Sequence, residues 1–189
     1  MIMIDVMKNT DFNELAKRAF ENARAKGFHD VDREDGHWLM LVVCELAEAV
    51  EADRSGRRAD RKEYERLVGA CDEIVRPHLF EMYIKDSVED ELADAVIRLL
   101  DFMGLKKIDV EKRLSKAGFD EEVVNSGKKM SFAAQVYDIV SMLCFDEYVE
   151  YTMNDVFRLA YRHDIDLIWF VNEKMKYNET REVLHGKSY

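Results

Sequence analysis

Two short acidic motifs lie inside otherwise apolar, helix-like segments of the chain. Glu45 and Glu48 belong to LMLVVCELAEAVEA, and Glu91 and Asp94 belong to SVEDELADAVIRLL. Within each motif the acids are three residues apart, so on a helix they lie one turn apart on the same side. Four carboxylates without a partner repel one another, whereas Mg²⁺ binds carboxylate oxygens and still accepts phosphate. The pattern predicts a metal site that handles phosphate.

The residues around these acids differ from those of an ordinary solvated helix face. An exposed acidic face usually carries Lys or Arg four residues after each acid. That position is alanine after Glu45, Glu48 and Glu91, whereas Asp94 is followed by Arg98, which can pair with it. A solvated face is the better interpretation of one such motif alone. Two matched motifs on apolar helices favour the metal site.

A di-iron carboxylate bundle also collects acids from several helices, but it needs histidine ligands three residues after a glutamate. No histidine of this chain stands at that position after a motif glutamate; the histidines are His29, His37, His78, His163 and His185. Ligation by oxygen alone indicates Mg²⁺, or Mn²⁺, in preference to iron or zinc.

Composition and charge limit the possible partners. The 189 residues suit a single domain over 1–189, and 48% hydrophobic with 35% charged residues is typical of a globular protein. The net charge of −11 argues against binding of a nucleic acid polymer, because phosphate backbones would be repelled. A small phosphorylated substrate is compatible with this charge, since a metal ion and a few cations reverse its sign locally.

Cysteine usage and hydropathy predict a cytoplasmic protein. The three cysteines are odd in number and form no CxxC pair, which favours a reducing compartment. The apolar N-terminus meets an acid at Asp5, unlike a signal peptide. No apolar stretch has the length of a membrane span, so no membrane association is expected.

One proline and eight glycines, with no long period-two alternation, predict an all-α fold. We expect a helical bundle around two antiparallel acidic helices, with about eight helices in all. The predicted helices are Asp11–Lys26, His37–Arg54, Asp60–Val75, Ser87–Met103, Asp109–Lys116, Ser131–Glu150, Asn154–His163 and Asp166–Tyr177. In the helix after Ser87, that serine is the expected N-cap and Gly104 the residue just past the C-terminus.

The ExxE and ExxD motifs resemble those of the all-α nucleoside triphosphate pyrophosphohydrolases, the MazG-like and dimeric dUTPase-like enzymes. The resemblance is widest from Leu39 to Gly104 and extends to the C-terminal WFVNEKMKYNETREVLHGKSY. It implies hydrolysis of a nucleoside triphosphate, with a deoxynucleotide favoured, to the monophosphate and pyrophosphate. The implied role is house-cleaning or control of the nucleotide pool, and the implied assembly is a homodimer or higher homo-oligomer.

The resemblance also implies roles for single residues. Mg²⁺ would be held by Glu45, Glu48, Glu91 and Asp94, and we select Glu48 as the acid that takes a proton from the attacking water. The C-terminal segment would contact the substrate, because Lys and Arg suit phosphate oxygens and Asn suits a base or sugar. The expected substrate-binding residues are Asn172, Lys176, Asn178 and Arg181.

Two features depart from the family pattern. Cys44 stands where the first motif often has a second glutamate, and the interval between the motifs is long. We interpret residues 52–86 as an insertion and residues 130–189 as C-terminal helices of the same domain. These departures keep an alternative open, a catalytically weak or inactive nucleotide-sensing or regulatory protein of the same fold.

Overall fold

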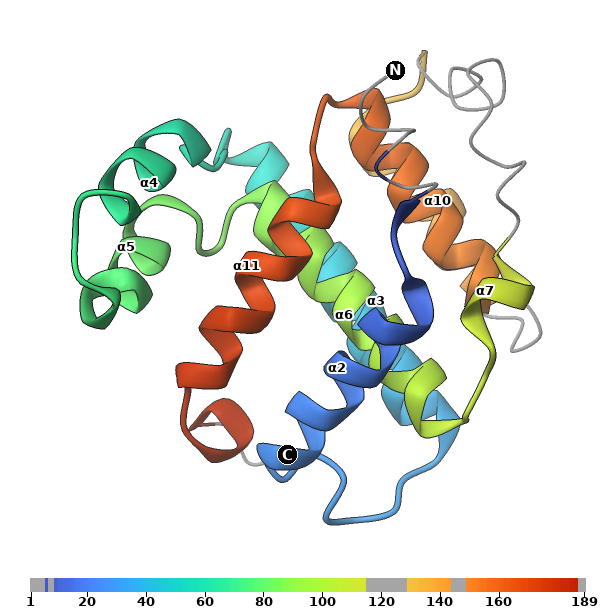
Figure 1. The fold of residues 1–189 in the computed structure, drawn as a ribbon. Helices are drawn as coiled ribbons and strands as arrows, with labels where there is room; N and C mark the ends of the chain where they lie inside the picture. Colours follow the sequence, from blue (N-terminus) through green and yellow to red (C-terminus); the bar gives the residue numbers. More distant parts are fainter. Residues whose placement is uncertain (1–5, 7–8, 115–128, 144–148, 187–189) are drawn as a thin grey trace.

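A computed structural model describes residues 6, 9–114, 129–143 and 149–186. Over these residues the chain forms helices and no strand, which confirms the predicted all-α fold of about eight helices (Figure 1). The nine α-helices are α2 Phe12–Ala25, α3 Asp35–Arg54, α4 Arg61–Val68, α5 Arg76–Tyr83, α6 Val88–Leu105, α7 Val110–Arg113, α9 Phe132–Leu143, α10 Val149–Arg162 and α11 Leu167–Thr180. Two short 3₁₀ helices are η1 Glu73–Val75 and η4 Val183–Gly186.

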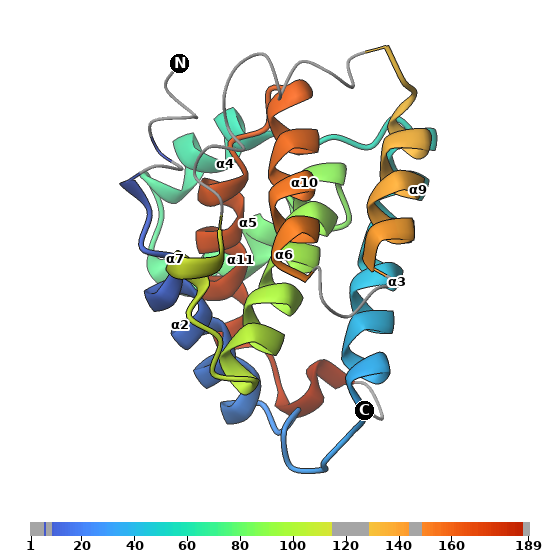
Figure 2. The ribbon, with the colours of Figure 1, turned by 90° about the vertical axis from the view of Figure 1, so that its right-hand side faces the viewer.

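Helix α6 lies at the centre of the bundle. It packs against α2, α3, α10 and α11, and α9 covers part of α3 (Figures 1 and 2). Apolar side chains are buried on several sides of this helix, among them Val88, Leu92, Val96, Leu99 and Met103. A helix that is apolar nearly all round needs neighbours on all sides, so its sequence explains its central position.

The two acidic helices, α3 and α6, run antiparallel, as predicted. Glu48 of α3 lies close to Glu91, near the start of α6. Glu45, one turn earlier on α3, contacts Arg98, two turns further along α6. This pairing brings the two acidic motifs face to face across the helix interface.

The start of α6 was predicted correctly, but its end was not. The Ser87 hydroxyl accepts a hydrogen bond of 3.2 Å from the Asp90 backbone N–H, as expected of an N-cap. Gly104 lies inside the helix, which continues to Leu105. A Cβ atom at Gly104 would lie 2.7 Å from the Phe20 Cβ and 2.9 Å from the Ala16 carbonyl oxygen of α2. Glycine is therefore needed for close helix packing and not for a turn.

The segment 52–86 contains one more helix than the sequence indicated. The predicted helix Asp60–Val75 ends at Val68, just before Gly69. Helix α5 begins at Arg76 with Pro77 in its first turn, a position where proline favours a helix start. Helices α4 and α5 lie together at one side of the bundle (Figure 1).

The C-terminal part also divides differently from the prediction. Helix α9 is described from Phe132 to Leu143, and residues 144–148 lie outside the described part of the chain. Helix α10 begins at Val149, so the last two residues of the predicted helix Ser131–Glu150 belong to the next helix. Helix α11 begins after Asp166, whose side chain accepts a hydrogen bond from the Trp169 N–H.

Candidate functional site

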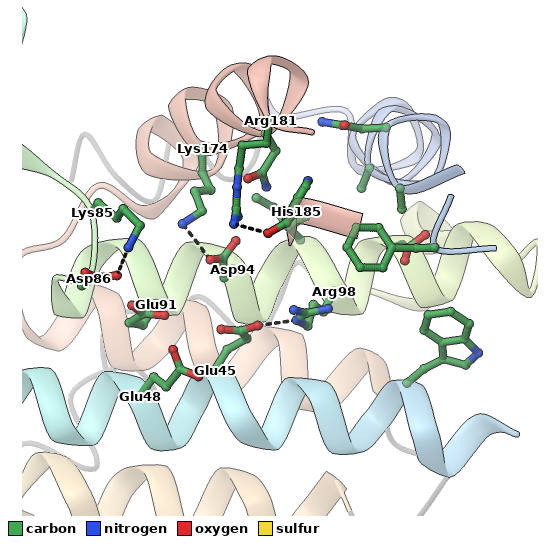
Figure 3. A pocket seen from close by; sticks show the side chains of 18 residues that line it. Glu45, Glu48, Lys85, Asp86, Glu91, Asp94, Arg98, Lys174, Arg181 and His185 are labelled. Carbon is green, nitrogen blue, oxygen red and sulfur yellow. Dashed lines mark hydrogen bonds and ion pairs between the residues drawn. The ribbon is translucent and has the colours of Figure 1, made fainter. Parts of the chain in front are cut away.

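A cavity of about 200 Å³ opens between α2, α3, α6 and α11. Its lining includes all four motif acids and several cationic side chains, which come from segments far apart in the sequence (Figure 3). The cations are Lys85, Arg98, Lys174 and Arg181. The structure therefore places acids suited to a metal ion beside cations suited to phosphate.

Three of the four predicted metal ligands converge. One carboxylate oxygen from each of Glu45, Glu48 and Glu91 lies within 4.8 Å of the other two. Figure 3 shows Glu45 and Glu48 projecting from α3 toward Glu91 on α6. Glu45 and Glu91 are buried, whereas Glu48 is exposed. These oxygens are close enough together to share one hard cation, which is the chemistry that the motifs predicted.

Asp94 lines the same cavity but has a different neighbour. Its Oδ2 atom lies 2.7 Å from the Lys174 Nζ, and it does not belong to the group of three acids. Arg98, which the sequence suggested as a partner for Asp94, instead pairs with Glu45 at 2.5 Å. Two of the four motif acids are thus neutralised by cations of the chain itself.

Lys174 is the main site residue that the sequence analysis missed. Its side chain is 4% exposed, and its Nζ lies 2.8 Å from both carboxylate oxygens of Asp90 as well as close to Asp94. Burial alone would lower the pKa of Lys174, but the charges of Asp94 and Asp90 raise it. Lys174 therefore remains a cation at the inner wall of the cavity.

Two of the four predicted substrate residues do not line this cavity. Asn172 accepts a hydrogen bond of 2.9 Å from Arg18, and Lys176 donates one of 2.6 Å to Glu173. Both contacts lie away from the acids because a residue two positions from Lys174 is rotated by about 200° around the helix. Asn172 and Lys176 thus lie on a different face of α11 from the one that borders the cavity, and their contact with a substrate stays a prediction.

The other two predicted substrate residues, Asn178 and Arg181, line the cavity. Asn178 follows Lys174 by one helical turn and therefore shares its face of α11. The Arg181 Nη2 donates a hydrogen bond of 3.3 Å to the His185 carbonyl oxygen. The sequence of α11 does not mark this face beforehand, because the full burial of Val171, three residues before Lys174, is known only from the packing of the helix.

Burial raises the pKa of several acids that line or adjoin the cavity. Desolvation, followed by the charges of Asp94 and Asp90, raises the pKa of Glu91 to about 9. Desolvation also raises the pKa of Glu45, although Arg98 opposes this effect. The pKa of Asp90 is raised to about 6, again mainly by burial. A divalent cation would reverse these shifts by compensating the negative charges.

These shifts predict that the metal-free protein loses stability as the pH rises. The folded-state pKa of Glu91, about 9, exceeds the ordinary value of 4.5, so the folded state retains a proton that the unfolded state releases between these values. The free energy of unfolding in EDTA should fall from pH 6 to pH 9. Mg²⁺ binding requires the carboxylate, so its affinity should rise over the same range.

Urea unfolding at several pH values, with EDTA and with Mg²⁺, tests this expectation. Glu91→Gln is the matched variant, because its side chain cannot ionise, and it should show a smaller decrease in stability with pH. A free energy of unfolding in EDTA that stays constant or rises from pH 6 to pH 9 would contradict the proposed desolvation of the cluster.

No helix among the described residues is both long and apolar enough to cross a lipid bilayer. Compared with models of known protein families, with curated proteins and with solved structures, the chain matches none. The resemblance to the all-α pyrophosphohydrolases, the homodimer and the cytoplasmic location thus stay predictions, and the function has to be argued from the site itself.

Proposed function

We propose that the protein hydrolyses a nucleoside triphosphate, with deoxynucleotides preferred, to the monophosphate and pyrophosphate in a Mg²⁺-dependent reaction. One observation carries the proposal: carboxylates from two helices approach within 4.8 Å in a cavity that four cationic side chains also line. A metal site without cations would suit many ligands, whereas this combination suits a bound polyphosphate. The resemblance of the two acidic motifs supports the same reaction.

The residues present fit a hard divalent cation. Glu45, Glu48 and Glu91 would hold Mg²⁺ or Mn²⁺, since each offers a carboxylate oxygen to the same volume. Asp94 is the proposed fourth ligand, and it would exchange its contact with Lys174 for the metal. The ion would neutralise charge on the phosphate oxygens and lower the pKa of a bound water.

The cations would hold the phosphate chain beside these acids. Lys174 projects from α11 toward Asp94, Arg181 lies beside it just after α11, and Lys85 lies in the turn before α6 (Figure 3). Nitrogen–hydrogen donors with a full positive charge form the strongest hydrogen bonds to phosphate oxygens. If a metal ion neutralised Asp94, Lys174 would keep its two contacts with Asp90, and the N–H that now faces Asp94 would be available to the substrate. The same lysine would therefore stabilise the metal-free site and bind phosphate in the loaded one.

Glu48 is the proposed general base. Glu45 is engaged by Arg98, and burial favours the protonated form of Glu91 in the metal-free protein. Glu48 is exposed, so water can reach it from the open side of the cavity. A carboxylate that belongs to the acid cluster and is also exposed to solvent is well placed to accept the proton of an attacking water.

Pyrophosphate release from a panel of nucleoside and deoxynucleoside triphosphates tests the proposed reaction. We expect release of one pyrophosphate per monophosphate in the presence of Mg²⁺ or Mn²⁺ and none in EDTA. Melting curves should show a metal-dependent rise in the unfolding temperature of the same sample. Orthophosphate as the first product, or equal rates in EDTA, would exclude the proposed reaction.

A second function is favoured by the two ion pairs of the cavity. Arg98 and Lys174 neutralise Glu45 and Asp94 without any metal, which would suit a protein that binds a nucleotide but does not hydrolyse it. Such a sensor would bind nucleoside triphosphates with similar affinity in Mg²⁺ and in EDTA. The pyrophosphate assay and calorimetric binding, measured on one preparation, distinguish the two functions.

A further inference from the structure

The cavity has two ends of different chemistry. On α6, Asp101 follows Glu91 by ten residues and lies about 15 Å further along the helix. On α3, Trp38 precedes Glu45 by seven residues, and because α3 and α6 are antiparallel it lies at the same end as Asp101. Both residues line the cavity, together with Phe28 and Ile97. This distal end is thus mainly apolar and aromatic, in contrast to the charged end with the acids.

Asp101 is the acidic side chain of the distal end, and His29 fixes its position. The His29 Nε2 lies 2.7 Å from the Asp101 Oδ1, and both side chains are nearly buried. The imidazole ring lies 5.0 Å from the ring of Phe20 and 5.0 Å from that of Trp38. Aromatic packing on two sides restricts the imidazole, so the carboxylate is also held in one orientation.

An ionised Asp101 offers the cavity hydrogen-bond acceptors and no donor. With the carboxylate charged, the His29 Nε2–H is the donor of their hydrogen bond, and it uses one of the two oxygens. The second oxygen can accept a hydrogen bond from a ligand. A ligand carbonyl in the same place would face an acceptor and lose its hydrogen bond to water.

Three buried polar atoms of residues that line the cavity lack a hydrogen-bond partner among the described residues. They are the Nε1 of Trp38, the Oδ1 of Asn178 and the Nε2 of His185. Burial, and then the charge of Arg181, lower the pKa of His185 to about 4, so its ring is neutral at physiological pH. Buried polar groups are rarely left unpaired in folded proteins, so these atoms are available to hydrogen bond with a molecule that enters the cavity.

We propose that the distal end binds a planar heterocyclic ring and that Asp101, positioned by His29, accepts a hydrogen bond from an amino group on that ring. The flat apolar surfaces of Phe28 and Trp38 suit such a ring. The proposal rests on the proposed function, in which the triphosphate occupies the charged end. It deepens that function by assigning the substrate class: nucleotides whose base carries an exocyclic amino group.

Two matched pairs of nucleotides test this amino group against a carbonyl. Cytosine and uracil differ at two adjacent positions: cytosine has an amino group beside a ring nitrogen that accepts a hydrogen bond, and uracil has a carbonyl beside a ring N–H that donates one. Adenine and hypoxanthine differ in the same way. If Asp101 faces the exocyclic position, the amino member binds more tightly, whereas if it faced the ring nitrogen the carbonyl member would. Calorimetric binding of the non-hydrolysable α,β-imido analogues of dCTP, dUTP, dATP and dITP with Mg²⁺ compares the two groups directly. In the pair that binds, the nucleotide with the amino group should bind at least about tenfold more tightly, because its amino group donates a hydrogen bond to the charged Asp101 carboxylate.

Substitutions at Asp101 and His29 test the roles proposed for these two residues in the amino preference. Asp101→Asn keeps the shape but adds an N–H donor, so the amino preference should disappear or reverse toward the carbonyl member. His29→Ala should also abolish the preference, whereas His29→Gln should retain it, because the glutamine amide can still donate to Asp101. Asp35→Asn is the control: Asp35 pairs with Lys106 outside the cavity, and the preference should be unchanged. A preserved Mg²⁺-dependent rise in melting temperature shows that each variant is folded.

The outcomes separate this proposal from the proposed function. Equal binding of the amino and carbonyl members in both pairs, or an undiminished preference in Asp101→Asn, overturns the proposal even when pyrophosphate is released. An amino preference that depends on Asp101 supports the proposal even when no triphosphate is hydrolysed, in which case only the proposed reaction is wrong.

Discussion

Replacement of Glu48 or Glu91 by Gln is expected to lower the rate of pyrophosphate release by about 10²–10³-fold or more. Glutamine keeps the shape of the side chain but removes the charge that a metal ion requires. Both acids belong to the group of three whose oxygens lie within 4.8 Å. The rate should be measured with saturating Mg²⁺ on the deoxynucleotide that the wild-type protein hydrolyses best.

The stability of the same variants distinguishes a catalytic role from a structural one. Glu91 is buried and its pKa is about 9, so in the metal-free protein at neutral pH it resembles the neutral glutamine. The metal-free Glu91→Gln protein should therefore melt at the same temperature or higher, while the rise on adding Mg²⁺ should be lost. Glu51→Gln is the matched control, since Glu51 is exposed on α3 and pairs with Arg54. Near-normal activity in both Glu48→Gln and Glu91→Gln would refute the catalytic assignment.

Lys174→Met is expected to destabilise the metal-free protein by about 3–5 kcal/mol, the usual cost of removing one partner of a buried ion pair. The substitution leaves Asp90, which is 1% exposed, and Asp94 without their cation. Urea unfolding in EDTA at neutral pH measures the effect. Adding Asp90→Asn to the variant should restore part of the stability, because the amide tolerates burial better than an unpaired carboxylate.

Lys176→Met is the matched control two residues further along α11. Its side chain is 47% exposed and pairs with Glu173 outside the cavity, so the loss should stay below about 1 kcal/mol. The Michaelis constant for the triphosphate should rise in Lys174→Met and stay unchanged in Lys176→Met. Similar losses of stability in both variants would contradict the assigned role of Lys174. A raised Michaelis constant in Lys176→Met would support the prediction from the sequence that Lys176 binds the substrate.

The acidic centre of the site could be predicted from the sequence because its geometry is local. Acids three residues apart on a helix share a face whatever surrounds them. Their apolar neighbours showed that this face is turned toward the interior and not toward solvent. The convergence of Glu45, Glu48 and Glu91 follows from these two facts together with the packing of α3 on α6. The all-α class was predictable for a similar reason, since few glycines and prolines interrupt the helical periodicity.

The partners of these acids could not be predicted, because they depend on how helices pack. Arg98 lies one turn after Asp94 on α6, yet it reaches across to Glu45 of α3. Asp94 and Asp90 take their cation from α11, 80 or more residues away in the chain. Helix α11 carries lysines at both 174 and 176, and its sequence alone did not show which one faces the acids.

What the sequence determined by itself was therefore the helical class and the four acids, because both arise from spacing within one helix. The choice of Lys174 over Lys176, and the pairing of His29 with Asp101, were decided only by the tertiary structure. Lys174 and Lys176 lie about 200° apart around α11, so the rotation of the whole helix about its axis decides which lysine faces the acids. That rotation is set by the burial of Val171 and Met175 against the core, which involves the whole bundle.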